Sequence, residues 1–322
     1  MRGFFFASPP SPLSKRRGGV SSLNIISTDY NLKKDLLYNT MNYFNFNGKI
    51  YEENKPVIGV SNRGLRYGDG LFETLKYKNN ELILADEHFA RLWKGMQLLQ
   101  FDVPKLLTPE RIQQEVMELL KKNKQNSARV RLTIIRGDGG IYDAKNHTAN
   151  YIIQTWSLDI DHSRLNENGL QLCIYPDAKK TVDHFSNIKH NNYLPYFMGA
   201  LFAQEQQCND ALLLNIHERI CDSTIANVFI IKNEIIYTTS LEEGCVAGIM
   251  RKFIIQHIAA SGYSIIETEI TKEMLLEADE VFLSNSIYNI RWVAAIADKK
   301  YTNNITRQLF QYLHQTNAAV FC

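Results

Sequence analysis

The chain has 322 residues, of which 45% are hydrophobic and 22% are charged, and its formal net charge is +2. This composition predicts a folded protein with enough apolar residues for one large domain or two medium ones. The small net charge gives no argument for binding nucleic acid or an anionic membrane, and the longest apolar runs, such as 228–231, are too short to cross a bilayer.

The five cysteines are scattered singly along the chain, at Cys173, Cys208, Cys221, Cys245 and Cys322. An odd number without close pairs argues against a disulfide framework and against a zinc site, so we expect no metal. A reducing compartment follows from this, and we expect the protein to be cytoplasmic.

Residues 1–40 differ from the rest of the chain, with paired prolines, a basic run at 15–17 and several serines. One interpretation is an organelle transit peptide, and the other, which we favour, is that translation starts at Met41. In both cases we expect the segment to be disordered.

The pattern after Met41 predicts short strands, turns and two helices. Residues 43–46 and 49–51 flank an Asn-Gly turn and predict a hairpin, and 71–77 predicts a strand with which 82–84 can pair. We expect the first helix to be capped by Asp86 and to run through Gln100. Its apolar face consists of Phe89, Leu92, Trp93, Met96 and Leu99.

The second predicted helix begins at Thr108 and Pro109, a capping residue followed by proline in the first turn. Its apolar stripe consists of Ile112, Val116, Leu119 and Leu120. Two further strands are predicted at 129–135 and 151–156. The polar, aperiodic segment 159–168 is the expected linker.

Beyond this linker the chain again mixes strands and helices. The predicted strands are 170–175, 211–214, 228–231 and 235–237, and the predicted helices are 198–206, 250–260, 272–277 and 306–314. We therefore expect an α+β or α/β protein with a smaller domain at 41–158, a larger one at 169–322 and a site between them.

Two segments combine residues suited to one type of chemistry. The segment 186–193 contains Lys189 among polar and aromatic neighbours, and 220–227 places Asp222 before an apolar strand. A Schiff-base lysine and a carboxylate for a ring nitrogen are what a protein supplies to pyridoxal phosphate. Without the other motifs, the simpler interpretation of Lys189 is a surface lysine, and that of Asp222 is a turn residue.

Four more segments stand in a fixed order around these two, at 63–74, 88–92, 246–251 and 281–286. Together the six resemble the class IV pyridoxal-phosphate enzymes: branched-chain aminotransferases, D-amino-acid aminotransferases and 4-amino-4-deoxychorismate lyases. The resemblance begins near Met41 and extends to the C-terminal region. It implies the two-domain, fold type IV architecture with pyridoxal 5′-phosphate between the domains.

The resemblance implies that Lys189 bonds the cofactor and carries a proton between the substrate Cα and the cofactor. Asp222 then holds the pyridine nitrogen, although the family usually has glutamate there and aspartate reaches about one bond less far. Arg91, in the pattern His-x-x-Arg-Leu, binds the phosphate; its plain alternative is a solvated arginine. Tyr193 is a further cofactor-pocket candidate, or else a core aromatic.

The phosphate turn implied by the resemblance contains Ile249 and Met250, whose backbone N–H groups would meet the anion at a helix start. The family often has threonine where this chain has Met250, so one hydroxyl is missing. Asn285 and Ser286 are candidates to replace it, the alternative for Ser286 being an ordinary turn serine.

Three residues are candidates to bind the substrate. Tyr67 resembles the aromatic residue that closes the pocket, and Lys76 stands where branched-chain enzymes tend to carry arginine. Arg136 opens a glycine-rich turn, 136–142, which resembles that of the deoxychorismate lyases. The Arg-x-His pattern of D-amino-acid aminotransferases is absent from this turn, which argues against that branch.

The favoured function is an aminotransferase of branched-chain type that moves an amino group between an amino acid and a 2-oxo acid through a lysine Schiff base. The alternative is 4-amino-4-deoxychorismate lyase, which eliminates pyruvate and gives 4-aminobenzoate. The turn at Arg136 and the motif 189–192 favour the lyase, whereas 72–74 favours the aminotransferase. A non-catalytic cofactor binder is the third hypothesis, which Asp222 and Met250 permit. The resemblance also implies a homodimer.

Overall fold

The computed structural model describes residues 42–142, 146–159 and 164–321. By its internal contacts Asn42–Cys322 is one compact unit. The expected disordered segment 1–40 lies outside the described residues, and so do residues 160–163 of the expected linker. None of the described helices combines the length and the apolar character needed to cross a membrane.

The first half of this unit is built on a six-stranded sheet with the strand order β2-β1-β6-β5-β3-β4, and all of its pairs are antiparallel. The strands are β1 (Tyr43–Phe46), β2 (Lys49–Glu52), β3 (Gly70–Lys78), β4 (Glu81–Leu82), β5 (Ala128–Arg136) and β6 (Ala149–Ser157). The predicted hairpin is confirmed, because Phe46 pairs with Lys49 across the Asn-Gly turn.

Three helices accompany this sheet: α2 (Arg63–Tyr67), α3 (Ala85–Leu98) and α4 (Pro109–Lys122). Side chains on the apolar faces of α3 and α4, such as Leu92 and Leu119, belong to one buried cluster with Leu71 and Leu75 of β3. One face of the sheet is thus covered by helices. The opposite face of β3 carries Phe72 and Thr74, which line a cavity.

The second half contains a nine-stranded sheet with the order β12-β11-β10-β13-β14-β7-β8-β9, and β15 pairs with β14. Its strands are β7 (Leu170–Lys180), β8 (Asp210–Asn215), β9 (Ile220–Ser223), β10 (Asn227–Lys232), β11 (Ile235–Thr239), β12 (Ile265–Thr268), β13 (Glu280–Asn285), β14 (Asn289–Ile296) and β15 (Lys299–Lys300). The central strands are buried on both faces, which explains their nearly continuous apolar sequences.

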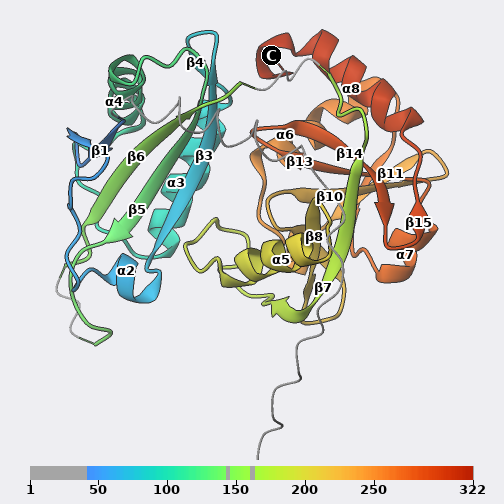
Figure 1. Cartoon of the computed structure of the whole chain (residues 1–322), viewed down its shortest axis with the longest axis horizontal. Coiled ribbons are helices and arrows are strands. Elements are labelled where there is room, and N and C mark those ends of the chain that lie inside the picture. Colours follow the sequence, from blue (N-terminus) through green and yellow to red (C-terminus); the bar gives the residue numbers. More distant parts are fainter. Residues whose placement is uncertain (1–41, 143–145, 160–163, 322) are drawn as a thin grey trace, which may run out of the picture. The chain divides into compact units, whose positions relative to one another are not determined.

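The helices of the second half are α5 (Leu194–Glu205), α6 (Ile249–Ile258), α7 (Lys272–Glu277), α8 (Asn304–Thr316) and α9 (Ala318–Phe321), with short 3-10 turns at Leu241–Glu243 and Ala259–Ser261. Helices α6 and α8 pack against β13 and share an apolar cluster that includes Phe229, Ile254 and Leu313. Helix α5 packs on β7 and β8 (Figure 1).

One local prediction was wrong, and one alternative interpretation is excluded. Asp86 does not cap α3, because the chain enters the helix directly from the turn after β4: Leu84 is the N-cap, with φ +53° and no side-chain cap bond. Asp86 lies in the first turn instead, where its charge favours the positive end of the helix dipole. Asp222 is no turn residue, because it lies within β9 and its register partner is Leu213 of β8.

The mixed α/β character expected from the sequence is confirmed by the two sheets and their helices. The strands of the first sheet end at Ser157 and those of the second begin at Leu170, so the described residues of the expected linker belong to no strand. The division into two separate domains remains a prediction.

Candidate active site

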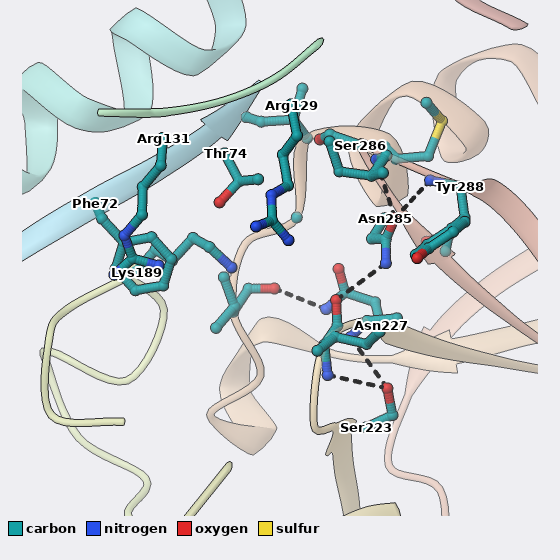
Figure 2. Close-up of a pocket in the computed structure, with 18 of the residues that line it drawn as sticks. Phe72, Thr74, Arg129, Arg131, Lys189, Ser223, Asn227, Asn285, Ser286 and Tyr288 are labelled. Atoms are coloured by element: carbon teal, nitrogen blue, oxygen red, sulfur yellow. Dashed lines mark hydrogen bonds between the residues drawn. The ribbon is translucent and has the colours of Figure 1, made fainter. Parts of the chain in front are cut away.

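A cavity of about 500 Å³ in the described part of the chain is lined by most of the candidate residues. It is lined by β3, β5 and the end of β6 on one side and by β9, the start of α6 and the turn after β13 on the other (Figure 2). Its charged lining consists of Arg91, Arg129, Arg131, Lys189 and Asp222. Four cations and a single carboxylate make this a site suited to anions.

Lys189 is held in place by backbone pairing to β3. The N–H of Phe72 donates to the carbonyl of Lys189 at 2.9 Å, and the N–H of Asn191 donates to the carbonyl of Gly70 at 2.9 Å. On the other side, Asn187 Nδ2 donates to the carbonyls of Leu241 and Cys245. The lysine therefore sits on a segment anchored at both of its flanks.

The amine of Lys189 points into the cavity beside aromatic rings. Its Nζ lies 4.8 Å from the ring centroid of Phe72 and 5.6 Å from that of Tyr193 (Figure 2). Burial, together with repulsion from Arg91, lowers the pKa of Lys189 to about 8. A larger share of the amine is therefore neutral near physiological pH than for an ordinary lysine, and the neutral form is the nucleophile.

Asp222 is buried at the cavity wall and carries four hydrogen bonds. Its Oδ2 accepts from Lys180 Nζ at 2.9 Å, from the hydroxyl of Tyr196 at 2.8 Å and from the N–H of Val246 at 3.1 Å. Its Oδ1 accepts from Asn227 Nδ2 at 3.0 Å. These bonds fix the orientation of the carboxylate.

Arg91 is oriented by a buried carboxylate. Its Nε and Nη2 donate to the two oxygens of Glu73 at 2.7 and 2.6 Å, and its Nη1 donates to the carbonyl of Ala247 at 2.7 Å. His88 Nδ1 lies 2.6 Å from the same carboxylate. Burial alone would raise the pKa of Glu73, but Arg91 and His88 lower it to about 2, so Glu73 is ionised.

The turn before α6 approaches its neighbours closely. A Cβ added to Gly248 would lie 1.8 Å from Asn227 Oδ1, so the position excludes every side chain. The first N–H groups of α6 have no partners within the helix and lie at the cavity with Ile249 and Met250. The side chain of Met250 is buried in the apolar core, so its contribution to the cavity comes from the backbone.

The end of β13 and the turn after it place Ser284, Asn285 and Ser286 at the cavity, and Figure 2 labels the last two. The Oδ1 of Asn285 accepts from the N–H groups of Ile287 and Tyr288 at 3.0 and 2.8 Å, so this side chain shapes the loop. Ser286 lines the cavity as predicted. Ser284 was not predicted, yet this residue lines the same cavity, and its buried hydroxyl has no hydrogen-bond partner among the described residues.

Tyr193 also lies at the cavity, directly before α5. Its ring stacks on Tyr196 with centroids 4.2 Å apart and meets Phe72 edge-on at 5.3 Å. Burial raises the pKa of Tyr193 to about 12, so its hydroxyl remains protonated at neutral pH. The structure thus brings together Lys189, Arg91, Tyr193, Asp222, Ile249, Met250, Asn285 and Ser286.

The three residues predicted to bind substrate are not brought to this cavity. Tyr67 ends α2 and its ring packs under the guanidinium of Arg66. Lys76 is fully buried, and its Nζ donates to Asn289 Oδ1 at 3.0 Å and to the carbonyl of Val320 at 2.9 Å. Arg136 is buried and its Nε donates to Asp69 at 3.0 Å. In the described chain Lys76 and Arg136 have structural partners.

Sequence reasoning also missed residues that the structure places at the cavity. Arg129 and Arg131 lie on β5 and alternate with the buried Val130. This alternation could have been found, because two charges at i and i+2 of an apolar strand share one face. Lys180, the partner of Asp222, could not have been found in this way, because the adjacent Lys179 is an equally good candidate in the sequence.

Comparisons with known proteins agree with this geometry. The family model described as "Amino-transferase class IV" matches residues 70–296. The chain is 27% identical over 242 residues to an aminodeoxychorismate lyase of Vibrio harveyi, covering 74% of this chain and 88% of that protein. It is 25% identical over 252 residues to a D-alanine aminotransferase of Bacillus licheniformis, covering 78% and 87%.

A solved structure shares the fold. The branched-chain aminotransferase of Thermoproteus uzoniensis, crystallised with norvaline, matches with a TM-score of 0.77 and 22% sequence identity. The match covers 87% of this chain and 95% of that one.

Proposed function

Because the chain belongs to the class IV aminotransferase family, we propose that it is an aminotransferase that moves an amino group between an amino acid and a 2-oxo acid. Enzymes of this family use pyridoxal 5′-phosphate. The observation that carries the proposal is the single cavity into which Lys189 points with a lowered pKa, and which Asp222 and Arg91 also line.

The donor set of the cavity fits pyridoxal phosphate. The start of α6 and Arg91 would hold the phosphate, and the unpartnered hydroxyl of Ser284 offers a further bond where the side chain of Met250 offers none. Asp222 would hold the pyridine nitrogen, and Tyr193 would pack at the ring. We propose that Ser284 supplies the polar contact for which Asn285 and Ser286 were the candidates in the sequence.

The bound cofactor supplies an electron-accepting pyridine ring and an aldehyde carbon that bonds amines. Lys189 would supply the amine that holds the cofactor and the base that takes the proton from the substrate Cα. Its lowered pKa suits both tasks, since a base works best when its pKa lies near the working pH.

Asp222 would act through its charge. Its hydrogen bonds from Lys180, Tyr196 and Asn227 hold the carboxylate in one orientation, although aspartate is shorter than the glutamate usual in the family. Because aspartate is shorter, either the cofactor ring would lie closer to Asp222 or a water molecule would bridge the carboxylate and the ring nitrogen. This geometry argues for a working acid-base site and against the non-catalytic binder.

The second candidate function is 4-amino-4-deoxychorismate lyase. The similarity to the aminodeoxychorismate lyase of Vibrio harveyi favours it. Its reaction would use the same Lys189 base but would end with loss of pyruvate and formation of 4-aminobenzoate. The glycine-rich turn 136–142 favoured the lyase in the sequence. Its Arg136 donates to Asp69 and does not line the cavity, so this residue gives the lyase no support.

A visible spectrum of the cofactor-loaded protein distinguishes these functions. Adding glutamate, a branched-chain amino acid or D-alanine, one at a time, should convert the cofactor to its pyridoxamine form if the protein is an aminotransferase. Release of 4-aminobenzoate from aminodeoxychorismate, without conversion by any amino acid, would favour the lyase. A spectrum unchanged by all of these substrates would overturn both proposals, with Lys189→Ala as the control that forms no bond to the cofactor.

We also propose that two copies of the chain associate. Helix α5 exposes four apolar side chains, Leu194, Phe197, Met198 and Leu201, which a second copy could cover. Light scattering during size-exclusion chromatography should give twice the mass of one chain, and a monomer at all concentrations would contradict the proposal.

A further inference from the structure

We propose that Asn227 is a positioning residue that joins the two ends of the cofactor site. Its side chain would keep Asp222 and the turn before α6 at the spacing that a single ligand needs to contact both. The inference rests on the proposed function, which assigns the ring nitrogen to Asp222 and the phosphate to the start of α6. Asn227 was not among the site residues predicted from the sequence.

The side-chain amide of Asn227 bridges the carboxylate and the turn. Its Nδ2 donates to Asp222 Oδ1 at 3.0 Å and to the carbonyl of Val246 at 2.8 Å. Both N–H bonds of one amide group are thereby used, one on each segment. The N–H of Val246 donates back to Asp222 Oδ2 at 3.1 Å. The turn is therefore connected to both oxygens of the carboxylate.

The same turn, residues 246–248, is also connected to the other functional segments. The carbonyl of Ala247 accepts from Arg91 Nη1 at 2.7 Å. The N–H of Ala247 donates to the carbonyl of Asn187 at 3.0 Å, two residues before Lys189. A shift of this turn would therefore move it relative to the arginine and the lysine as well as to the carboxylate.

Asn227 is itself held on a rigid element. It is buried at the start of β10, where its register partner is Ser284 of β13. Its Oδ1 packs so closely on the turn that a Cβ added to Gly248 would lie 1.8 Å away. Figure 2 shows Asn227 in the wall of the cavity. A site built on strands keeps its geometry better than one built on loops, and Asn227 extends this advantage to the turn.

Asn227 also determines which atom of Asp222 remains for a ligand. A carboxylate offers about four lone-pair positions, two on each oxygen. Oδ2 accepts from three groups, Lys180 Nζ, the hydroxyl of Tyr196 and the N–H of Val246. Among the described residues Oδ1 accepts only from Asn227. The remaining position is on Oδ1, so a ring N–H would meet the oxygen that Asn227 orients.

This connection matters most for a ligand that carries two binding groups at a fixed distance. A fragment that meets only Asp222, or only the turn, can follow its partner when that partner shifts. A ligand that meets both cannot, and its advantage over the separate fragments depends on the spacing. Loss of the Asn227 amide should therefore weaken the linked ligand more than either fragment.

Three probes that cannot react test this inference: pyridoxine 5′-phosphate, pyridoxine and inorganic phosphate. None of them carries the aldehyde that bonds a lysine. Calorimetry on the full chain without cofactor gives the three Kd values. The product of the two fragment Kd values, divided by the Kd of pyridoxine 5′-phosphate, is an effective concentration. Asn227→Ala should lower it about tenfold, as for one hydrogen bond to a charged group, and change each fragment Kd by less than about threefold.

A matched control is Asn215→Ala. Asn215 is also buried, and its Nδ2 also donates to a carboxylate oxygen and a backbone carbonyl, both of Glu243, but it does not line the cavity. This variant should lose stability in urea and keep the effective concentration. If Asn227→Ala does not fold, Asn227→Ser replaces it with the same expected result, because its hydroxyl is too short to reach both partners.

An unchanged effective concentration in the Asn227 variant, or an equal fall in Asn215→Ala, would overturn the inference. So would fragment losses as large as the loss of pyridoxine 5′-phosphate. These outcomes are separate from the proposed reaction. If the expected fall is observed but the cofactor-loaded protein converts no amino acid and no aminodeoxychorismate, only the proposed reaction fails. If a substrate is converted and the effective concentration is unchanged in the Asn227 variant, only the inference fails.

Discussion

Replacing Lys180 by methionine tests how much the buried pair of Lys180 and Asp222 contributes to stability. Lys180 Nζ donates to Asp222 Oδ2 at 2.9 Å and to the carbonyl of Gly244 at 2.7 Å, and its side chain is 7% exposed. Lys180→Met leaves a buried carboxylate without its counter-charge. Removing one partner of a buried pair costs about 3–5 kcal/mol of unfolding free energy.

We expect a loss near the lower end, about 3 kcal/mol, because Asp222 keeps the hydrogen bonds from Tyr196, Asn227 and the Val246 N–H. Burial alone would lower the pKa of Lys180, but Asp222 raises it above the ordinary lysine value. The stabilisation by the Lys180–Asp222 pair is therefore complete at pH values below the ordinary lysine pKa. It is lost only as the pH rises through the raised pKa of Lys180. The difference between wild type and variant should stay constant across neutral pH.

The neighbouring residue provides the control. Lys179 pairs with Glu218 at 2.9 Å, but the two side chains are 28% and 57% exposed, so Lys179→Met should cost no more than about 1 kcal/mol. Urea unfolding followed by circular dichroism, with and without cofactor, gives both values. If Lys180→Met is no more destabilising than Lys179→Met, or if adding Asp222→Asn restores no stability, the pair does not have the role argued here.

Three further predictions follow from the same geometry. In protein without cofactor, the reactivity of Lys189 toward an amine-labelling reagent should rise with a midpoint near pH 8, and a midpoint of an ordinary lysine would contradict its burial. Glu73→Gln should lower stability at neutral pH by about 3 kcal/mol, because a pKa lowered from 4.5 to about 2 contributes stability above pH 4.5 that is lost as the pH falls toward 2. Urea unfolding curves of wild type and this variant should therefore converge in acid, and parallel curves would exclude the mechanism. Gly248→Ala should weaken cofactor binding at least about tenfold in a fluorescence titration, because its Cβ would clash with Asn227; unchanged affinity would mean that the turn can move.

Much of the fold could be predicted because local patterns and tertiary structure agree. Thr108 caps α4 as expected and its stripe from Ile112 to Leu120 is buried, since capping and a 3.6-residue period act within one helix. The N-cap of α3 was misplaced by two residues for the opposite reason. Its N-cap is Leu84 in the left-handed region, a choice imposed by the turn after β4 rather than by a capping side chain.

The site was predicted where a short motif fixes the chemistry and missed where partners come from distant strands. Lys189 and Asp222 lie at one cavity as expected, although 33 positions separate them in the printed numbering. Lys180 could not be distinguished from Lys179, because alternate residues of a strand face opposite ways and only the folded sheet shows which side holds Asp222. Lys76 shows the converse error: its motif suggested a substrate contact, but its amine meets Asn289 and the C-terminal segment.

The most direct test of the account is to identify which lysine bonds the cofactor. Borohydride reduction of the protein loaded with pyridoxal phosphate makes that bond permanent, and mass spectrometry of its peptides then locates it. We predict the label on Lys189, whose amine points into the cavity with a lowered pKa. A label on Lys180, the buried lysine beside Asp222, or on any other lysine in place of Lys189 would contradict the assignment of the site.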